Sequence, residues 1–327
     1  MVIQNMALLD VQDLITHYVT LRGSVKAAEK VSFQVEKGEA LGLAGESGCG
    51  KTTVALSILK ILPQGGRIMG GKIIFGGEDL VKLKESEMRK RVRWKGISIV
   101  FQGAMNALNP VYKVGDQIVE AILTHESDVS KDEAKERVGK LFEMVGMEPS
   151  RADHYPHEFS GGMRQRALIA MSIACNPQLL IADEPGTALD VIVQAQVLRL
   201  LRELKERLNL GMILITHDLS IIAETCEKAA IMYAGKLVEY GDIVTIFKEP
   251  YHPYTQGLIG AFPSIKAAKK RMTSIPGFPP DLLDPPPGCR FHPRCPFVMV
   301  VCKSKEPELA DIDKRDHYVA CHLVKKT

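Results

Sequence analysis

Residues 45–52 (GESGCGKT) fit the pattern G-x-x-x-x-G-K-[ST], and this segment constrains the fold more than any other. It lies between an apolar, strand-like run at residues 40–44 and a helix-like run that begins at Thr52. Glycines allow backbone N–H groups to curl around an anion, and a helix starting at the end of the loop turns its positive dipole end toward that anion. We therefore expect a strand, a phosphate-binding loop and a helix in this order.

This loop predicts which atoms would contact a nucleoside triphosphate. The Lys51 ammonium would reach the β- and γ-phosphates, and the Thr52 hydroxyl would bind Mg2+. Cys49 is interpreted as a small residue that fills the loop, although its place at a helix N-terminus would lower a thiol pKa. The expected nucleotide contacts in this segment are Gly45, Ser47, Gly48, Cys49, Gly50, Lys51, Thr52 and Thr53.

Length and charge limit the classes of protein to which the chain can belong. Its 327 residues suffice for two domains, or for one large domain with an appendage. The 42 basic and 39 acidic residues leave a net charge of +3, so no basic excess indicates nucleic acid as a partner. No apolar run approaches the roughly 18 residues of a membrane span, and the N-terminus lacks the basic region of a signal peptide. We expect a cytoplasmic chain that would serve a membrane as a bound subunit.

Apolar periodicity predicts strands that alternate with helices, which is typical of an α/β fold with parallel strands. The expected strands are residues 40–44, 72–75, 97–101, 179–182 and 212–216. The expected helices are residues 52–62, 131–145, 162–175 and 191–208. Residues 103–175 are interpreted as an inserted helical subdomain, and residues 230–241 as a hairpin that turns at Ala234-Gly235.

The composition changes after Pro250. Prolines cluster between residues 276 and 296, so this segment is expected to be extended or irregular. It is too short to build a core of its own, and four cysteines lie in or near it. We predict a nucleotide-binding domain over residues 1–250 and a Pro/Cys-rich extension over residues 251–327.

Two further patterns indicate phosphate chemistry. An apolar run ends in Asp183 and Glu184, which places both carboxylates at the edge of the sheet where α/β proteins bind ligands. Asp183 suits the Mg2+ shell, and Glu184 suits a general base that orients the attacking water. Ser160 can cap the helix that starts at Gly161 and Gly162, whose accessible N–H groups form a second anion site. Each pattern alone is common. Their presence in the same chain as the phosphate-binding loop is what indicates that they take part in phosphate chemistry.

Together these motifs resemble the nucleotide-binding subunits of ATP-binding cassette (ABC) transporters, from Leu9 to His322. The family signature is usually Leu-Ser-Gly-Gly-Gln, whereas this chain has Phe159 and Met163 at its first and last positions. The segments that resemble the oligopeptide/dipeptide importer branch are FSGGMRQR (159–166), YPHEF (155–159), FQGAMNALNP (101–110), ALDVIVQAQ (188–196) and GCRFHPRCP (288–296). The resemblance implies a P-loop, RecA-like α/β core with an antiparallel β subdomain, an inserted helical subdomain and a Pro/Cys-rich extension.

The resemblance also implies roles for single residues. Gln102 would sense Mg2+ and water and contact the transmembrane partner, and His217 would hold the γ-phosphate. Asp190 belongs to a loop that crosses to the other subunit, and Tyr18 aligns with the aromatic residue that stacks on adenine. The implied catalytic residues are Lys51, Gln102, Glu184 and His217, and the implied Mg2+ ligands are Thr52, Gln102 and Asp183.

One chain carries two different anion sites, which favours a dimer. In a head-to-tail pair, Ser160 and Gly162 of one chain would close over ATP held by Lys51 of the other, so hydrolysis would open the interface. The resemblance implies a second cassette that is a paralogue, with a homodimer as the alternative. It also implies two transmembrane permease subunits, an extracytoplasmic peptide-binding protein, and a place at the cytoplasmic face of the membrane. The implied activity is ATP hydrolysis that drives uptake of di- and oligopeptides.

The cysteine tail has the spacing Cys289-x5-Cys295-x6-Cys302-x18-Cys321. Four thiolates can bind zinc or an iron–sulfur cluster, and the sequence lacks the C-x2–4-C knuckle with which zinc sites typically begin. The resemblance implies a [4Fe-4S] cluster, because the oligopeptide/dipeptide branch carries one on such a tail. Zinc, with His292 or His322 replacing a thiolate, and unligated thiols stay open as alternatives.

Other functions fit part of the pattern. A cassette ATPase that acts on DNA would have long coiled coils between its phosphate loop and its signature, and the segment between residues 52 and 160 is too short for them. A cassette that acts on the ribosome would usually carry two cassettes in one chain. Oligosaccharides and nickel are further cargoes within the branch, and the cassette does not touch its cargo.

Overall fold

The computed structural model describes residues 7–103, 107–261, 275–312 and 314–324, so residues 104–106 of the segment FQGAMNALNP lie outside it. The chain forms two compact units. The first unit comprises Met1–Val35, Ala40–Val81 and Ile215–Thr327, and the second comprises Glu36–Glu39 and Lys82–Leu214. None of the helices in the described ranges is long and apolar enough to cross a membrane.

The first unit contains an antiparallel sheet with the strand order β2-β1-β4-β5. Its strands are β1 (Leu9–Thr20), β2 (Gly23–Val35), β4 (Gly66–Phe75) and β5 (Glu78–Asp79). The β1–β2 register shifts three times between Val11 and Tyr18, and Asp13 has a left-handed φ of 46°. Such bulges break the alternation of apolar and polar residues that identifies a strand from sequence. The antiparallel subdomain is confirmed, but β1 and β2 were not located from the sequence.

The first unit also contains the strand order β11-β12-β10-β9-β3. Strand β3 (Ala40–Ala44) is fully buried and pairs in parallel with β9 (Lys228–Tyr233). The predicted hairpin is confirmed, because β9 pairs antiparallel with β10 (Lys236–Asp242), and Ala234 and Gly235 have φ of 46° and 82° between them. Two short strands of the tail, β11 (Ala310–Asp311) and β12 (Tyr318–Val319), continue this sheet from β10.

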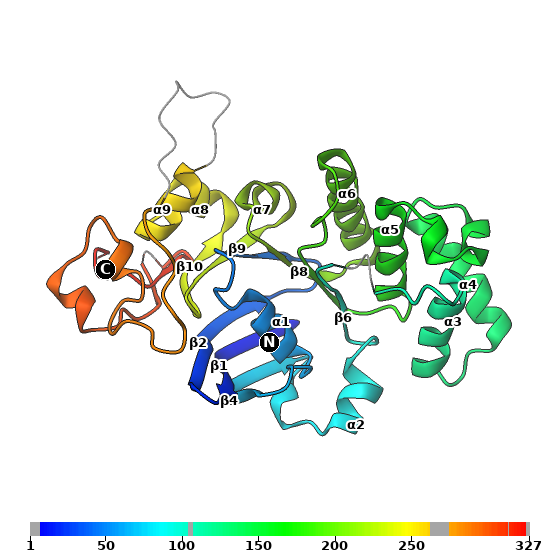
Figure 1. Ribbon diagram of the computed structural model, residues 1–327, viewed down its shortest axis with the longest axis horizontal. Coiled ribbons are helices and arrows are strands. Elements are labelled where there is room, and N and C mark those ends of the chain that lie inside the picture. Colours follow the sequence, from blue (N-terminus) through cyan, green and yellow to red (C-terminus); the bar gives the residue numbers. More distant parts are fainter. Residues whose placement is uncertain (1–6, 104–106, 262–274, 313, 325–327) are drawn as a thin grey trace, which may run out of the picture. The chain divides into compact units, whose positions relative to one another are not determined.

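The helices of the first unit are α1 (Lys51–Ile58), α7 (Leu219–Thr225), α8 (Ile243–Lys248) and α9 (Pro253–Gly260). Helix α1 ends four residues before the predicted end, because Lys60 has a left-handed φ of 51° and Pro63 follows. Helix α7 packs closely on β3, since a Cβ on Gly42 would lie 2.2 Å from Cγ2 of Ile222. Figure 1 shows α1 beside the antiparallel strands β1, β2 and β4.

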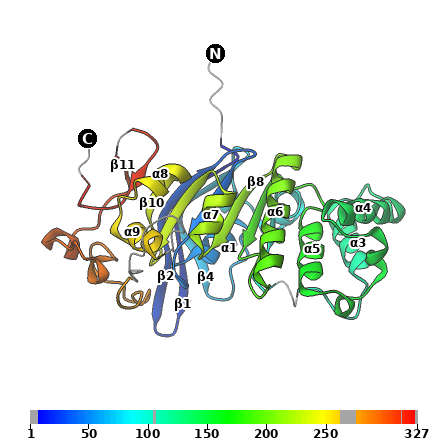
Figure 2. The same ribbon diagram turned by 90° about the horizontal axis from the view of Figure 1, so that it is seen from above.

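The second unit is mostly helical and contains the strand order β8-β7-β6. Its strands are β6 (Ile97–Val100), β7 (Leu179–Asp183) and β8 (Gly211–Thr216), the last two residues of which belong to the first unit. Its helices are α2 (Glu85–Glu87), a π-helical turn (Met88–Val92), α3 (Val114–His125), α4 (Lys131–Met144), α5 (Gly161–Ser172) and α6 (Val191–Leu208). Helices α3, α4 and α5 contact one another, and α5 also contacts α6 (Figure 2). The predicted helical insertion is confirmed.

The proline-rich extension is irregular, as expected. Within residues 275–312 the only helical turns are two short 3-10 helices, His292–Arg294 and Val300–Lys303. The extension is packed on the first unit through Phe291, which is 2% exposed and contacts the rings of Tyr233 and Tyr254 at centroid distances of 5.1 and 5.4 Å. The domain boundary that we predict at residue 250 stays a prediction.

Candidate functional site

The predicted phosphate-binding loop joins the end of β3 to the start of α1. Gly45 and Gly50 have φ of 148° and 107°, a region that favours glycine. A Cβ on Gly50 would lie 2.0 Å from the carbonyl oxygen of Ala27, and one on Gly45 would lie 2.2 Å from that of Met232. The loop therefore lies directly against the backbones of β2 and β9, and neither glycine can be replaced without a shift of that backbone.

The Lys51 ammonium is held over this loop. It is 6% exposed and donates to the carbonyl oxygens of Gly45 and Glu46 at 2.7 and 3.1 Å. Thr52 is exposed at the first turn of α1. Burial raises the pKa of the Cys49 thiol more than the nearby Lys51 lowers it, so Cys49 fills space and is not an activated nucleophile.

Tyr18 and His217 also belong to the first unit. The Tyr18 hydroxyl lies 3.3 Å from the hydroxyl of Thr53 in α1, so the half-buried ring stands beside the phosphate-binding loop. His217 follows β8 and is exposed, whereas Thr216 before it is buried and its hydroxyl accepts the N–H of Asp218 at 3.1 Å. The imidazole is thus displayed at the end of a buried strand.

The predicted carboxylates lie at the end of β7 in the second unit. Asp183 is 1% exposed, and Glu184 has a left-handed φ of 46°. One carboxylate oxygen of Glu184 accepts the amide of Gln102 and the hydroxyl of Thr187, both at 2.9 Å. Residues 102 and 184 are thereby brought together. A non-glycine residue in the left-handed region is strained, and such strain clusters at active sites.

Ser160 caps α5, as predicted from the sequence. Its hydroxyl accepts the N–H of Met163 at 3.3 Å. Gly161 and Gly162 follow in the first turn, where a Cβ on Gly162 would lie 2.6 Å from Cγ1 of Val193. Asp190 caps α6 by accepting the N–H groups of Ile192 and Val193 at 3.1 and 3.0 Å. The glycine at 162 thus permits α6 to approach the start of α5.

The structure brings the predicted residues together in two sets. The set in the first unit is Tyr18, Gly45, Ser47, Gly48, Cys49, Gly50, Lys51, Thr52, Thr53 and His217. The set in the second unit is Gln102, Ser160, Gly161, Gly162, Asp183, Glu184 and Asp190. It stays a prediction that Gln102, Asp183 and Glu184 act on the ATP held by the first set, and that the other residues of the second set act on the ATP of a second cassette.

The four C-terminal cysteines line one small cavity, together with His292 and His322. Burial, followed by the neighbouring thiols, raises the pKa of Cys289 to about 11. The same causes raise the pKa of Cys295 and Cys321. Throughout the described ranges, however, no group of three or more His, Cys, Asp or Glu side chains is arranged to hold a metal ion. The predicted metal site is therefore not confirmed.

Sequence reasoning missed the residues that support the loop from behind. Tyr254 and Arg294 both bond to Glu46, the second residue of the loop. The signal available in the sequence was an acidic residue inside a loop expected to bind an anion, which calls for a compensating cation.

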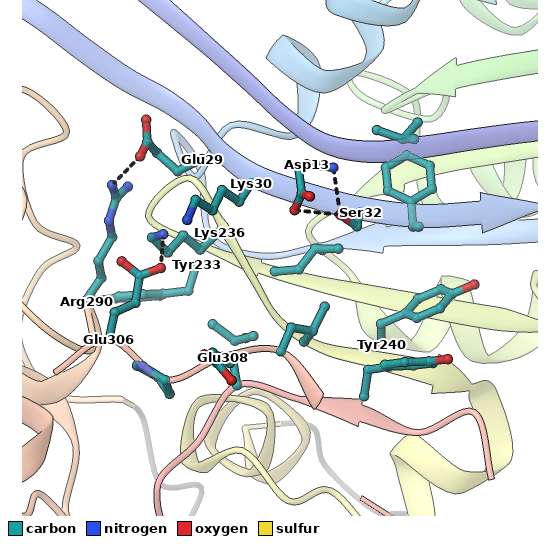
Figure 3. A pocket seen from close by; sticks show the side chains of 18 of the residues that line it. Asp13, Glu29, Lys30, Ser32, Tyr233, Lys236, Tyr240, Arg290, Glu306 and Glu308 are labelled. Carbon is teal, nitrogen blue, oxygen red and sulfur yellow. Dashed lines mark hydrogen bonds and ion pairs between the residues drawn. The ribbon is translucent and has the colours of Figure 1, made fainter. Parts of the chain in front are cut away.

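A separate pocket of about 940 Å3 lies on the first unit (Figure 3). It is lined by β1, β2, the β9–β10 hairpin and the extension. Its charges are largely paired with one another, since Arg290 contacts Glu29 at 3.8 Å and Lys236 contacts Glu306. This pocket contains none of the predicted nucleotide contacts.

Comparison with known proteins identifies the family. A family model described as ABC transporter matches residues 28–187, and one described as oligopeptide/dipeptide transporter, C-terminal region, matches residues 238–302. The chain is 47% identical to the probable peptide ABC transporter ATP-binding protein y4tR of Sinorhizobium fredii, over 96% of this chain and 94% of that protein. The chain belongs to the ABC transporter family. Within it, the chain is an ATP-binding subunit of the oligopeptide/dipeptide branch, and thus an ATPase.

Other relatives agree with this placement. The oligopeptide transport ATP-binding protein OppD of Bacillus subtilis is 45% identical over 97% of this chain and 89% of its own length. The dipeptide transport ATP-binding protein DppD of Escherichia coli is 45% identical over 93% of both chains. Among solved structures, the dimeric ABC transporter cassette MJ0796 is 25% identical with a TM-score of 0.64, over 72% of this chain and 98% of that cassette. The ABC ATPase fold predicted from the sequence is confirmed.

Proposed function

We propose that this ABC ATPase subunit drives the uptake of di- and oligopeptides. The observation that supports the proposal is identity of 45–47% over more than nine-tenths of the chain to ATP-binding proteins named for peptide, oligopeptide or dipeptide transport. A second family model, for the C-terminal region of oligopeptide/dipeptide transporters, matches residues 238–302, beyond the residues that the ABC transporter model matches. Oligosaccharide and nickel uptake are the alternatives that the test below separates.

The proposed chemistry is phosphoryl transfer from ATP to water, in which the protein mainly positions groups and neutralises charge. Lys51 reaches from its loop carbonyls to the β- and γ-phosphates, and Tyr18 stacks on adenine beside α1. Thr52, Gln102 and Asp183 would hold Mg2+, which neutralises phosphate charge when bound. Their oxygen donors fit that hard cation.

Glu184 is the proposed general base, and His217 the proposed contact to the γ-phosphate. The hydrogen bonds from Gln102 and Thr187 orient the Glu184 carboxylate, as a general base requires. The exposed imidazole of His217 extends from the end of β8. Glu184 and His217, with Gln102 and Thr187 bonded to Glu184, provide the orientation and charge that phosphoryl transfer requires.

We propose that the active form is a head-to-tail pair of cassettes. Ser160, Gly161 and Gly162 at the start of α5 would close over ATP bound to the other cassette, while Asp190 crosses the interface. The second cassette is a paralogue or a second copy, and the pair binds two permease subunits at the cytoplasmic face of the membrane. An extracytoplasmic peptide-binding protein delivers the cargo to that complex.

We propose further that the cysteine tail holds a [4Fe-4S] cluster. All four thiols line one cavity, and the other three all contribute to the raised pKa of Cys289, so the four are near neighbours. The cysteine spacing lacks the C-x2–4-C knuckle with which zinc sites typically begin, and this wider spacing suits a four-iron cubane better than zinc. The cluster would staple an extension that has little regular structure.

A metal analysis tests the cluster. After anaerobic purification, we expect iron and acid-labile sulfide in equal amounts, both lost from Cys295→Ser because one of the four thiolates is missing. Cys226→Ala removes a buried cysteine outside the tail and is expected to retain both. Zinc without sulfide, or no metal at all, would refute the cluster.

A transport assay tests the cargo. The chain is reconstituted in proteoliposomes with its permeases, its second cassette and its binding protein. We expect ATP-dependent uptake of a labelled dipeptide or oligopeptide, abolished in Lys51→Ala because the phosphates lose their ammonium partner. Uptake of an oligosaccharide or of Ni2+ in place of peptides would contradict the proposed function.

A further inference from the structure

The C-terminal extension holds the second residue of the phosphate-binding loop. Arg294 donates from Nη1 to one carboxylate oxygen of Glu46 at 2.6 Å and from Nη2 to the other at 2.9 Å. This is the two-pronged geometry in which guanidinium and carboxylate bind most strongly. The Arg294 side chain is 6% exposed and the Glu46 side chain 26%, so solvent screens the pair only in part.

The guanidinium is fixed on its other sides as well. Its Nε donates to the carbonyl oxygen of Pro276 at 2.8 Å, and Nη1 also reaches the hydroxyl of Tyr233 at 3.3 Å. The N–H of Glu46 donates to the hydroxyl of Tyr254 at 2.9 Å. The rings of Tyr233 and Tyr254 are 4.7 Å apart, and both contact Phe291 of the extension. Residue 46 is therefore held through both its backbone and its side chain.

The ion pair between Arg294 and Glu46 affects how the loop would bind the negative charges of ATP. ATP brings several negative charges to a loop that itself contains a carboxylate, and like charges within a few ångströms repel strongly where water is partly excluded. The Lys51 ammonium donates to the carbonyl oxygen of Glu46. The cation that is proposed to bind the phosphates is therefore bonded to the same residue whose carboxylate would repel them. Arg294 turns the Glu46 carboxylate toward the extension and neutralises it.

We propose that Arg294 is a positioning residue for the phosphate-binding loop, and that by neutralising and orienting Glu46 it sets the affinity of the loop for ATP. The proposal rests on the proposed role of this loop as the ATP site. It assigns the extension a task in nucleotide binding that is separate from any metal its cysteines hold.

Binding of a fluorescent ATP analogue to the full chain with Mg2+ tests the proposal. Arg294→Gln leaves the Glu46 charge uncompensated, and we expect its Kd to rise about ten-fold, as loss of hydrogen bonds to a charged group would give. Glu46→Gln is expected to bind at least as tightly as the wild type. The double variant should return to within about two-fold of the wild type, because the two changes are coupled.

The chain offers a matched control. Arg93 and Glu85 form the same two-pronged pair, at 2.6 and 2.9 Å, within the second unit, whereas the phosphate-binding loop belongs to the first. Arg93→Gln should leave the Kd unchanged. Added salt should narrow the difference between Arg294→Gln and the wild type, which a purely structural role of Arg294 would not explain.

Three outcomes would overturn the proposal. They are an unchanged Kd in Arg294→Gln, a double variant that binds as weakly as Arg294→Gln, and an effect of Arg93→Gln equal to that of Arg294→Gln. If Arg294→Gln does not fold, Arg294→Lys takes its place, because lysine keeps the positive charge. A ten-fold rise in the Kd of Arg294→Lys for ATP would show that neutralising Glu46 is not what Arg294 contributes, and would refute the proposal. Lys51→Ala tests the role of the loop itself. If Lys51→Ala binds ATP as tightly as the wild type, the loop is not the ATP site, and the proposal for Arg294 falls with it; if Lys51→Ala loses ATP binding while Arg294→Gln keeps it, only the proposal for Arg294 is refuted.

Discussion

Glu184→Gln is expected to bind ATP as the wild type does and to lose steady-state hydrolysis by about a thousand-fold, within the range that general-base removal gives. The amide keeps the shape of the side chain and can still bond to Thr187, but it cannot take a proton from water. With ATP unhydrolysed, the cassette dimer should stay closed. Phosphate release measures the first effect, and size-exclusion chromatography with ATP and Mg2+ measures the second.

The control for this prediction is Glu203→Gln. Glu203 is exposed on α6 and pairs with Arg199 at 2.8 Å, so its loss should leave hydrolysis unchanged. Retained hydrolysis in Glu184→Gln would remove Glu184 from the role of base.

Gly50→Ala is expected to destabilise the nucleotide-free protein by about 3 kcal/mol and to abolish ATP binding, because the new Cβ meets backbone in a left-handed conformation. The Cβ would lie 2.0 Å from the carbonyl oxygen of Ala27 at a φ of 107°. That oxygen belongs to β2, which cannot retreat without disturbing its pairing with β1. Urea unfolding and ATP titration measure the two effects.

Gly48→Ala is the matched comparison within the same loop. Gly48 has a φ of 78°, but nothing lies within 4 Å of its Cβ position. The cost should then be only that of the left-handed backbone, about 1 kcal/mol. Equal destabilisation by the two substitutions would show that backbone conformation, and not the contact with Ala27, governs this loop.

Features with local signals were predictable from the sequence. The phosphate-binding loop, the buried strand β3 and helix α6 were predicted because their glycines, apolar run and apolar periodicity lie within short segments. Strand β4 was predicted only in its second half, since Gly71 with a φ of 89° interrupts it beside a register shift with β1. The two-residue strands β11 and β12 are too short to leave any periodicity.

The candidate site divides in the same way. Local sequence indicated Lys51 and Glu184 individually, because Lys51 belongs to the phosphate-binding loop motif and Glu184 directly follows a recognisable strand. It did not indicate that Gln102 bonds to Glu184, since the two are 82 residues apart. Arg294 and Glu46 are separated by 248 residues. Only tertiary packing brings such distant residues into contact, and no short sequence pattern predicts these contacts.

The contact between Arg294 and Glu46 also bears on the order in which the chain is made. Synthesis proceeds from the N-terminus, and N-terminal parts generally fold first. The loop at residues 45–52 is therefore synthesised long before Arg294, Tyr254 and the last strand β12 leave the ribosome. Until then Glu46 has no guanidinium to neutralise it. If Arg294 acts as we propose, a nascent or prematurely ended chain thus carries a phosphate-binding loop that binds ATP more weakly than the loop of the finished chain.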